Sequence, residues 1–152
     1  VLLLLYRASR PQVATLARTA IHGNGVWVDA GRADALTARD DVIVVRVESG
    51  LFFANADNVR QAIRERLTPA TIAVVLDAET TPSIDVSATE MLTHLAVELR
   101  RGNVTLVVAH SIGQVRDVLR RAGADAQVLQ SMYPTVDEAV ASFEPGGRRI
   151  DP

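Results

Sequence analysis

The sequence predicts an α/β fold with a mixed β-sheet and about four helices. Short runs of β-branched and aliphatic residues alternate with longer segments in which apolar residues recur every three or four positions. This is the pattern of strands that alternate with amphipathic helices. Two neighbouring apolar runs that precede the alternation are typical of a β-hairpin. With 152 residues, the chain is long enough for one such domain and short for two.

The first strands are predicted where valine and isoleucine are dense. Residues 26–28 and 42–47 are two such runs, and the segment between them reads as a polar loop. Ser49 and Gly50 predict a tight turn into a further strand at residues 51–53, so this strand and the one before it are expected to form a hairpin. Later strands are predicted at residues 72–76, 104–109 and 126–130. The first two of these are apolar enough to be buried on both faces.

Four helices are predicted from the spacing of their apolar residues. In residues 56–67, Val59, Ile63 and Leu67 lie four apart on one helix face, and Pro69 ends the segment. Three later stripes have a similar period. They are Ala88, Met91, Leu92, Leu95 and Leu99, then Val115, Val118, Leu119 and Ala122, and finally Val136, Ala139, Val140 and Phe143.

Hydroxyl residues mark the starts of the last three helices. Ser87, Ser111 and Thr135 are each followed three positions later by Glu or Gln, which is the capping-box pattern, so each is predicted to cap its helix. Gly102 and Gly123 stand where the left-handed residue after a helix belongs.

Composition argues against several classes of function. A formal net charge of −2 and a pI near 5.9 do not fit a protein that binds the nucleic-acid backbone. Aromatic residues make up only 4% of the chain, too few to suggest stacking on single strands, so no nucleic acid is expected as a partner. The chain has no cysteine, which excludes disulfides, thiolate chemistry and cysteine-ligated zinc.

The first six residues are apolar but far short of the roughly 18 needed to span a bilayer. They end in Tyr6, and Arg7 and Arg10 follow, which is the flanking pattern of the cytoplasmic end of a transmembrane helix. We therefore expect residues 1–6 to be the truncated end of such a helix, although an exposed strand or part of a signal-peptide core has a similar composition. The expected divisions after it are a juxtamembrane linker at residues 7–25, the folded domain at residues 26–144 and a flexible tail at residues 145–152.

Four blocks of sequence carry a resemblance to a known family. They are the apolar stub of residues 1–6 with residues 7–11 (Arg-Ala-Ser-Arg-Pro), residues 51–56 (Leu-Phe-Phe-Ala-Asn-Ala), residues 75–77 with 84–88 (Val-Leu-Asp and Ile-Asp-Val-Ser-Ala), and residues 98–102 (Glu-Leu-Arg-Arg-Gly). On these blocks the chain resembles the C-terminal STAS domain of SulP anion transporters of the sulfate permease type, a distant relative of anti-sigma-factor antagonists. The resemblance extends over nearly the whole chain. Residues 51–56 are its most specific block, because they look like the transporter branch rather than the free-standing antagonists.

The resemblance implies a STAS-type mixed sheet with the helices packed mainly on one side. It also implies a non-enzymatic regulatory or interaction domain of a sulfate-type anion transporter, at the cytoplasmic face of the bacterial inner membrane. Such a domain would dock to the transmembrane domain of the same protein, to a second STAS copy or to a cytosolic regulator. The alternatives are a nucleotide-responsive switch and a free-standing, phosphorylatable antagonist.

In the antagonist relatives, the hydroxyl two positions after the Asp at this helix start is phosphorylated, which makes Ser87 the phosphorylation candidate here. A phosphate at this place would meet helix N-terminal amides, but Asp85 and Glu90 would repel it. We therefore expect Ser87 to act chiefly as a structural cap.

STAS-like domains have also been associated with nucleoside triphosphates, so GTP, GDP or ATP is a candidate weak regulatory ligand. The sequence has neither a P-loop nor a Gly-x-Gly-x-x-Gly motif. A nucleotide site would therefore use helix N-terminal amides and an arginine. Its candidate residues are Asn55, Asp85, Ser87, Ser111 and Arg116.

No catalytic or metal-binding constellation is predicted, and no cofactor is expected to be required. Asp77 and Asp85 lie near the ends of strand-like segments, but no histidine stands at ligand spacing and no nucleophile is nearby, so turn and helix-start roles are expected. His22, His94 and His110 are scattered along the chain, and His110 is expected to face a loop.

Overall fold

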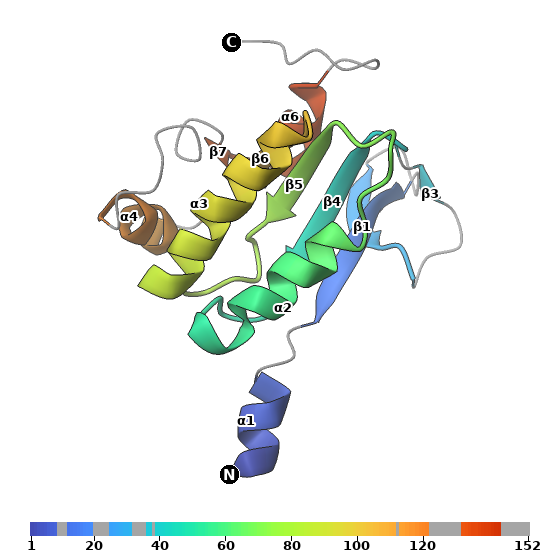
Figure 1. Cartoon of the computed structure of the whole chain (residues 1–152). Coiled ribbons are helices and arrows are strands. Elements are labelled where there is room, and N and C mark those ends of the chain that lie inside the picture. Colours follow the sequence, from blue (N-terminus) through green and yellow to red (C-terminus); the bar gives the residue numbers. More distant parts are fainter. Residues whose placement is uncertain are drawn as a thin grey trace.

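Seven strands form one mixed sheet in the computed structural model of the chain, which describes residues 1–8, 12–19, 25–31, 36–37, 39–111, 113–121 and 132–143 (Figure 1). The strand order is β2-β1-β4-β5-β6-β7, and β3 also pairs with β1. The strands are β1 (Val13–Thr19), β2 (Val26–Asp29), β3 (Leu36–Thr37), β4 (Val42–Val47), β5 (Ala73–Asp77), β6 (Thr105–Ala109) and β7 (Met132–Tyr133). The helices in the described residues are α1 (Leu2–Ala8), α2 (Phe53–Arg64), α3 (Val86–Arg101), α4 (Gly113–Arg121) and α6 (Val136–Ala141).

The sheet is antiparallel on one side of β4 and parallel on the other. β1 pairs antiparallel with β2, β3 and β4, whereas β4, β5, β6 and β7 pair in parallel. Parallel neighbours need crossover connections, and α2 and α3 supply them between β4, β5 and β6. These three strands therefore end at one edge of the sheet, at Val47, Asp77 and Ala109, and α2 and α3 begin there at Phe53 and Val86 (Figure 1). We call this the carboxyl edge.

Helices cover the two faces of the sheet unequally. α2, α3 and α4 pack on one face, and α6 packs on the other. Side chains alternate between these layers along each strand, so Val45 and Leu76 belong to the first core, and Val44 and Val75 to the second. The predicted α/β fold with helices mainly on one side is therefore confirmed.

Most of the predicted periodic elements are confirmed within the described residues. All five residues of β5 and the last four of β6 are buried, as expected for strands covered on both faces. The predicted stripe of α3 is buried along its length. Buried stripe residues of the other helices are Val59 and Ile63 in α2, Val115 and Leu119 in α4, and Val136 and Ala139 in α6.

The predicted hairpin is wrong. β4 is paired on one side with β1 and on the other with β5, so neither of its edges is left for residues 51–53. Leu51 instead forms an isolated parallel bridge with Ile84, and Phe53 is the first residue of α2. The helix predicted at residues 56–67 therefore begins three residues earlier and ends at Arg64.

The predicted linker contains a strand of the sheet. Residues Val13–Thr19 form β1 between β2 and β4, with Leu16, Ala17 and Thr19 buried. The first strand of the domain is therefore β1 rather than the strand predicted at residues 26–28. The loop predicted before β4 likewise contains the short strand β3. The strand predicted at residues 126–130, Ala122, Gly123 and the tail at residues 145–152 lie outside the described residues.

The left-handed residue after α3 is Asn103 rather than the predicted Gly102. Gly102 has φ −91° and Asn103 has φ 59°. The amides of both Gly102 and Val104 donate to the carbonyl of Leu99, so the chain reverses one residue later than expected. Asparagine tolerates the left-handed region better than most residues.

α1 lies apart from the two layers (Figure 1). Its side chains Leu2, Leu3, Leu4 and Tyr6 are exposed, and Leu2 is 84% exposed. No helix in the described part of the chain is long and apolar enough to cross a membrane.

Glu98 of α3 links α3 to α2. Its Oε2 accepts a hydrogen bond from Arg60 Nη2 at 2.7 Å, and its Oε1 lies 2.6 Å from Arg64 Nη2. The hydrogen bond from Arg60 is the main cause that holds the pKa of Glu98 below its ordinary value of 4.5, and desolvation opposes it.

We expect Glu98→Gln to lower the free energy of unfolding at pH 7 by about 1 kcal/mol or less, because solvent screens these half-exposed arginines. The pKa of Glu98 is lower in the folded state, so its contribution is present above the unfolded-state pKa and is lost as the pH falls through the folded-state pKa. Urea unfolding should show the difference at pH 7 and a smaller one at pH 3. Glu90→Gln, on the same helix, is the control, and an unchanged difference for E98Q at pH 3 would contradict the assignment.

Candidate functional site

Asp85 connects the first turns of α2 and α3 at the carboxyl edge. It is the N-cap of α3, where its Oδ1 accepts a hydrogen bond from the Ala88 amide at 2.8 Å. Its Oδ2 accepts a second hydrogen bond, at 2.9 Å, from the amide of Phe53, the first residue of α2. One carboxylate therefore satisfies an otherwise unpaired amide from each of two helices.

Asn55 stabilises the loop that leads into α2. Its side chain is fully buried in the first turn of α2, where its Oδ1 accepts from the Phe52 amide at 3.0 Å. Its Nδ2 donates to the Gly50 carbonyl at 2.8 Å. Both ends of the amide are used internally, so Asn55 shapes the loop before α2 and does not present its side chain to a ligand.

Ser87 is not the cap of α3, which corrects the prediction. It is the second residue of the helix, and Asp85 takes the cap position because its backbone is extended there, with φ −101° and ψ 177°. The side chain of Ser87 is exposed and forms no hydrogen bond within the described residues. The hydroxyl of Ser87 is therefore accessible at the carboxyl edge.

Ser111 and Arg116 lie farther along the sheet, beside α4. α4 begins at Gly113, so its cap position falls on residue 112, outside the described residues, and the Ser111 hydroxyl instead contacts Met132 Sδ at 3.9 Å. Arg116 lines a cavity of about 370 Å³ with Arg120, Met132 and Pro134.

The third predicted cap, Thr135, is confirmed, because its Oγ1 accepts from the Glu138 amide at 3.1 Å.

The five predicted site residues thus fall into two groups. Asn55, Asp85 and Ser87 gather where α2 and α3 begin, whereas Ser111 and Arg116 lie beside α4 and β7. No hydrogen bond or ion pair in the described residues joins the two groups. The contacts of the described residues therefore do not join the five predicted residues into one nucleotide site.

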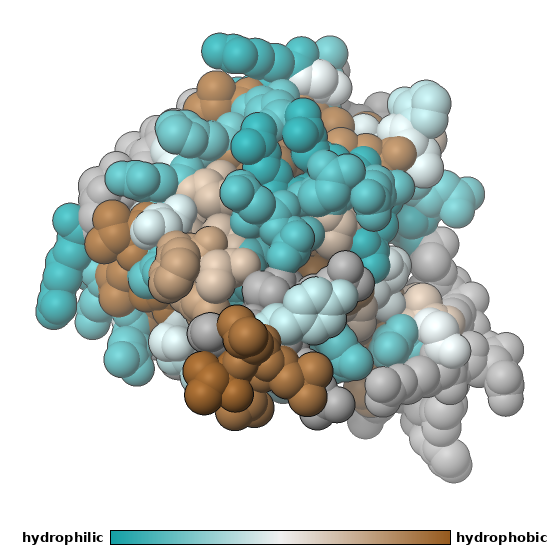
Figure 2. Space-filling model, turned by 60° about the horizontal axis from the view of Figure 1, so that its bottom comes forward, coloured by the Kyte–Doolittle hydropathy of each residue, from teal (hydrophilic) through white to brown (hydrophobic). Residues whose placement is uncertain are grey.

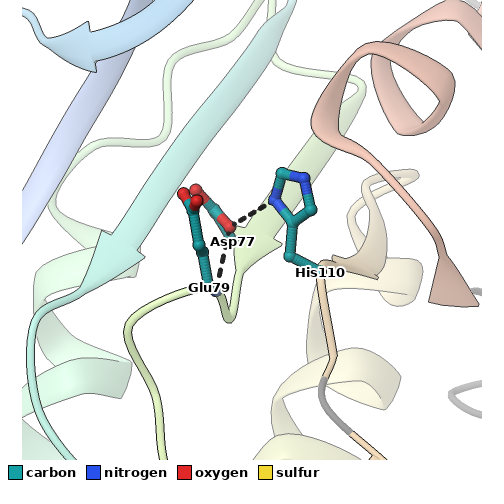
Figure 3. A group of neighbouring side chains, drawn as sticks. All are labelled: Asp77, Glu79 and His110. Carbon is teal, nitrogen blue, oxygen red and sulfur yellow. Dashed lines mark hydrogen bonds and ion pairs between the residues drawn. The ribbon is translucent and has the colours of Figure 1, made fainter.

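A charged cluster at the carboxyl edge was not predicted from the sequence. Asp77 is fully buried at the end of β5, and its Oδ1 lies 3.0 Å from Nδ1 of His110 (Figure 3). On the other side, Arg46 of β4 donates from Nε to Oδ2 of Asp77 at 2.8 Å and from Nη2 to Glu79 at 2.6 Å. His110 therefore does not merely face a loop, as expected, but is held by Asp77 with a left-handed backbone, φ 54°.

The cluster contains ligand types that bind metals, because ligand atoms of Asp77, Glu79 and His110 lie within 4.8 Å of one another. Arg46 argues against a metal role. Its guanidinium already pairs with both carboxylates, and a buried carboxylate needs one such counter-charge. The cluster is thus a hydrogen-bonded network in which Arg46 pairs with the buried Asp77 and with Glu79. Its signal in the sequence is an arginine and an aspartate that interrupt two otherwise apolar, adjacent strands.

Comparisons with known proteins agree with the fold. The sequence pattern of the STAS domain matches residues 35–139. Sulfate transporter 1.3 of Arabidopsis thaliana is 27% identical over 154 residues, which cover 93% of this chain and 23% of that protein. The chain therefore spans about a quarter of the length of this curated relative.

Two solved structures share the fold at low sequence identity. The murine solute carrier 26 family member A9 anion transporter, in its inward-facing state, superposes with a TM-score of 0.80 at 18% identity, over 92% of this chain and 23% of that one. The Bacillus cell fate determinant SpoIIAA, in its phosphorylated form, superposes with a TM-score of 0.53 at 17% identity, over 69% of this chain and 93% of that one.

We expect Asp85→Ala to lower the free energy of unfolding by about 2 kcal/mol, because it removes a helix cap and a second hydrogen bond from a charged acceptor. Ser87→Ala is the matched control and should change it by about 0.5 kcal/mol or less, since its side chain is exposed and unbonded. Denaturant unfolding of both variants measures the effects. The reverse order of the two effects would restore Ser87 as the cap.

Proposed function

The chain belongs to the STAS domain family, and on that basis we propose that it is the cytoplasmic regulatory and interaction domain of a sulfate-type anion transporter. The observation that carries the proposal is the match to a sulfate transporter, which extends over 93% of the chain. The domain would act without catalysis, by docking to the transmembrane domain of the same protein at the cytoplasmic face of the bacterial inner membrane.

The apolar surface of α1 supports attachment to a membrane. Four exposed apolar side chains, Val1 to Leu4, precede Tyr6 and Arg7, and no core in the described residues covers them. Figure 2 shows this apolar surface as a brown group at the lower front of the molecule. We propose that α1 continues a transmembrane helix at its cytoplasmic end, where an aromatic ring and a basic residue mark the interface.

The vesicle affinity of α1 tests this attachment. We expect the chain to co-float with zwitterionic lipid vesicles and the variant Leu2→Ser, Leu3→Ser, Leu4→Ser to bind at least tenfold more weakly. Burial of an aliphatic side chain contributes roughly 1.5 kcal/mol or more, and three are removed. Val26→Ser, which changes an exposed apolar residue of β2, is the control. Equal flotation of the triple variant and the wild type would refute the attachment.

The cavity beside Arg116 favours a second candidate, a weak nucleotide-responsive switch. Arg116 and Arg120 both line this cavity, and arginine is suited to phosphate groups. Ser111 adjoins this cavity through Met132. GTP, GDP or ATP would bind here and alter the contact between the domain and its partner.

The nucleotide proposal predicts saturable amide shifts around Ser111 and Arg116 when GTP, GDP or ATP is titrated into the chain at millimolar concentration. Arg116→Ala should abolish them by removing a phosphate donor, whereas Arg101→Ala, at the far end of α3, should leave them intact. NMR of the labelled chain measures both. If no shifts saturate, the docking function stands without a nucleotide.

The exposed hydroxyl of Ser87 favours a phosphorylation-based alternative. It lies at the carboxyl edge and is not engaged in capping. A phosphate there would add nearly two negative charges to the surface where α2 and α3 begin. This alternative would make the chain a relative of the free-standing antagonists in mechanism as well as in fold.

A further inference from the structure

Two exposed apolar residues at the carboxyl edge point to a partner surface. Resting on the proposed attachment of α1, we propose that Phe53 and Val86 form a docking edge for basic cytoplasmic loops of a helical membrane protein. The partner surface would combine aliphatic side chains with lysine or arginine. The two residues are the first of α2 and α3, and they are held together by the Asp85 hydrogen bond to the Phe53 amide.

Neither residue is needed to fill a core. Phe53 is 74% exposed and Val86 is 59% exposed, and neither belongs to the two hydrophobic cores. Besides those of α1, the other exposed large apolar side chain in the described residues is Val26, on a different strand. Two exposed apolar side chains that contribute little to folding are available for a partner.

Chain connectivity brings this edge close to α1. The carbonyl of Gln12, at the start of β1, accepts a hydrogen bond from the Glu48 amide at 3.0 Å, which places that start at the carboxyl edge. Only four Cα steps separate Ala8 from Gln12, so they span at most about 14 Å. Figure 1 shows α1 on the side of the molecule where α2 and α3 begin. A membrane that holds α1 therefore also lies near Phe53 and Val86.

The charges around the carboxyl edge favour a protein over a lipid surface as its partner. Glu48, Asp57 and Glu90 are exposed carboxylates that form no ion pair within the described residues. Arg46, a basic side chain at the edge, is occupied by Asp77 and Glu79. This acidic rim repels anionic lipid headgroups and attracts cations. The cytoplasmic loops of membrane proteins carry an excess of lysine and arginine, so their chemistry complements the rim.

The test uses the 152-residue chain with Leu2, Leu3 and Leu4 changed to serine, so that α1 does not contribute, and an amphipathic leucine–lysine peptide as the probe. We expect saturable NMR shifts at the first turns of α2 and α3. Phe53→Ser with Val86→Ser should weaken binding at least fivefold, and so should Asp57→Asn with Glu90→Gln. Val26→Ser should leave it unchanged. All three substituted sets change exposed side chains, and the dispersion of the NMR spectrum verifies their folding.

Two results would overturn the proposal. One is peptide binding that neither pair of substitutions weakens. The other is the same set of shifts on adding anionic vesicles without peptide, which would assign the edge to lipid. The vesicle flotation of α1 uses no peptide and leaves Phe53 and Val86 intact, so loss of membrane attachment and loss of the docking edge give separate signals.

Discussion

Two backbone amides from different helices converge on the carboxylate of Asp85, and the carboxyl edge depends on this convergence. Without it, the starts of α2 and α3 would be joined there mainly by the bridge between Leu51 and Ile84. The arrangement fixes the loop around the buried Asn55 and leaves Phe53 and Val86 exposed to solvent at the starts of α2 and α3. A local capping requirement thus determines the chemistry of a surface.

The same edge contains a buried charge, the carboxylate of Asp77. Asp77 lies within a sheet covered on both faces, where an unpaired carboxylate costs several kcal/mol. Arg46 compensates for it from the neighbouring strand, and Glu79 and His110 complete the network. Because all four groups come from the ends of β4, β5 and β6 or just beyond, the network links those ends into one rigid base for the loops above.

Local sequence patterns were sufficient for the elements that bury a periodic or continuous apolar surface, such as β5 and α3. They failed for β1, whose alanine residues disfavour strands and which forms because β2 and β4 pair with it. Aromatic residues favour strands, yet Phe53 starts a helix. Its backbone amide donates a hydrogen bond to the carboxylate of Asp85, which lies 32 positions away in the sequence. Asp85 was correctly singled out as a helix-start residue. The neighbours of Asp77 were not predictable, since Arg46 meets it only through strand register.

The position of β1 has a mechanical consequence. This strand lies inside the sheet, between β2 and β4, and a short segment joins it to α1. A force applied to α1 along the direction of β1 would load the hydrogen bonds to both neighbouring strands together, in shear, rather than break them one after another. The sheet would then follow a displacement of α1 as a rigid body. α1 would in this way transmit movement at one end of the chain to the whole domain.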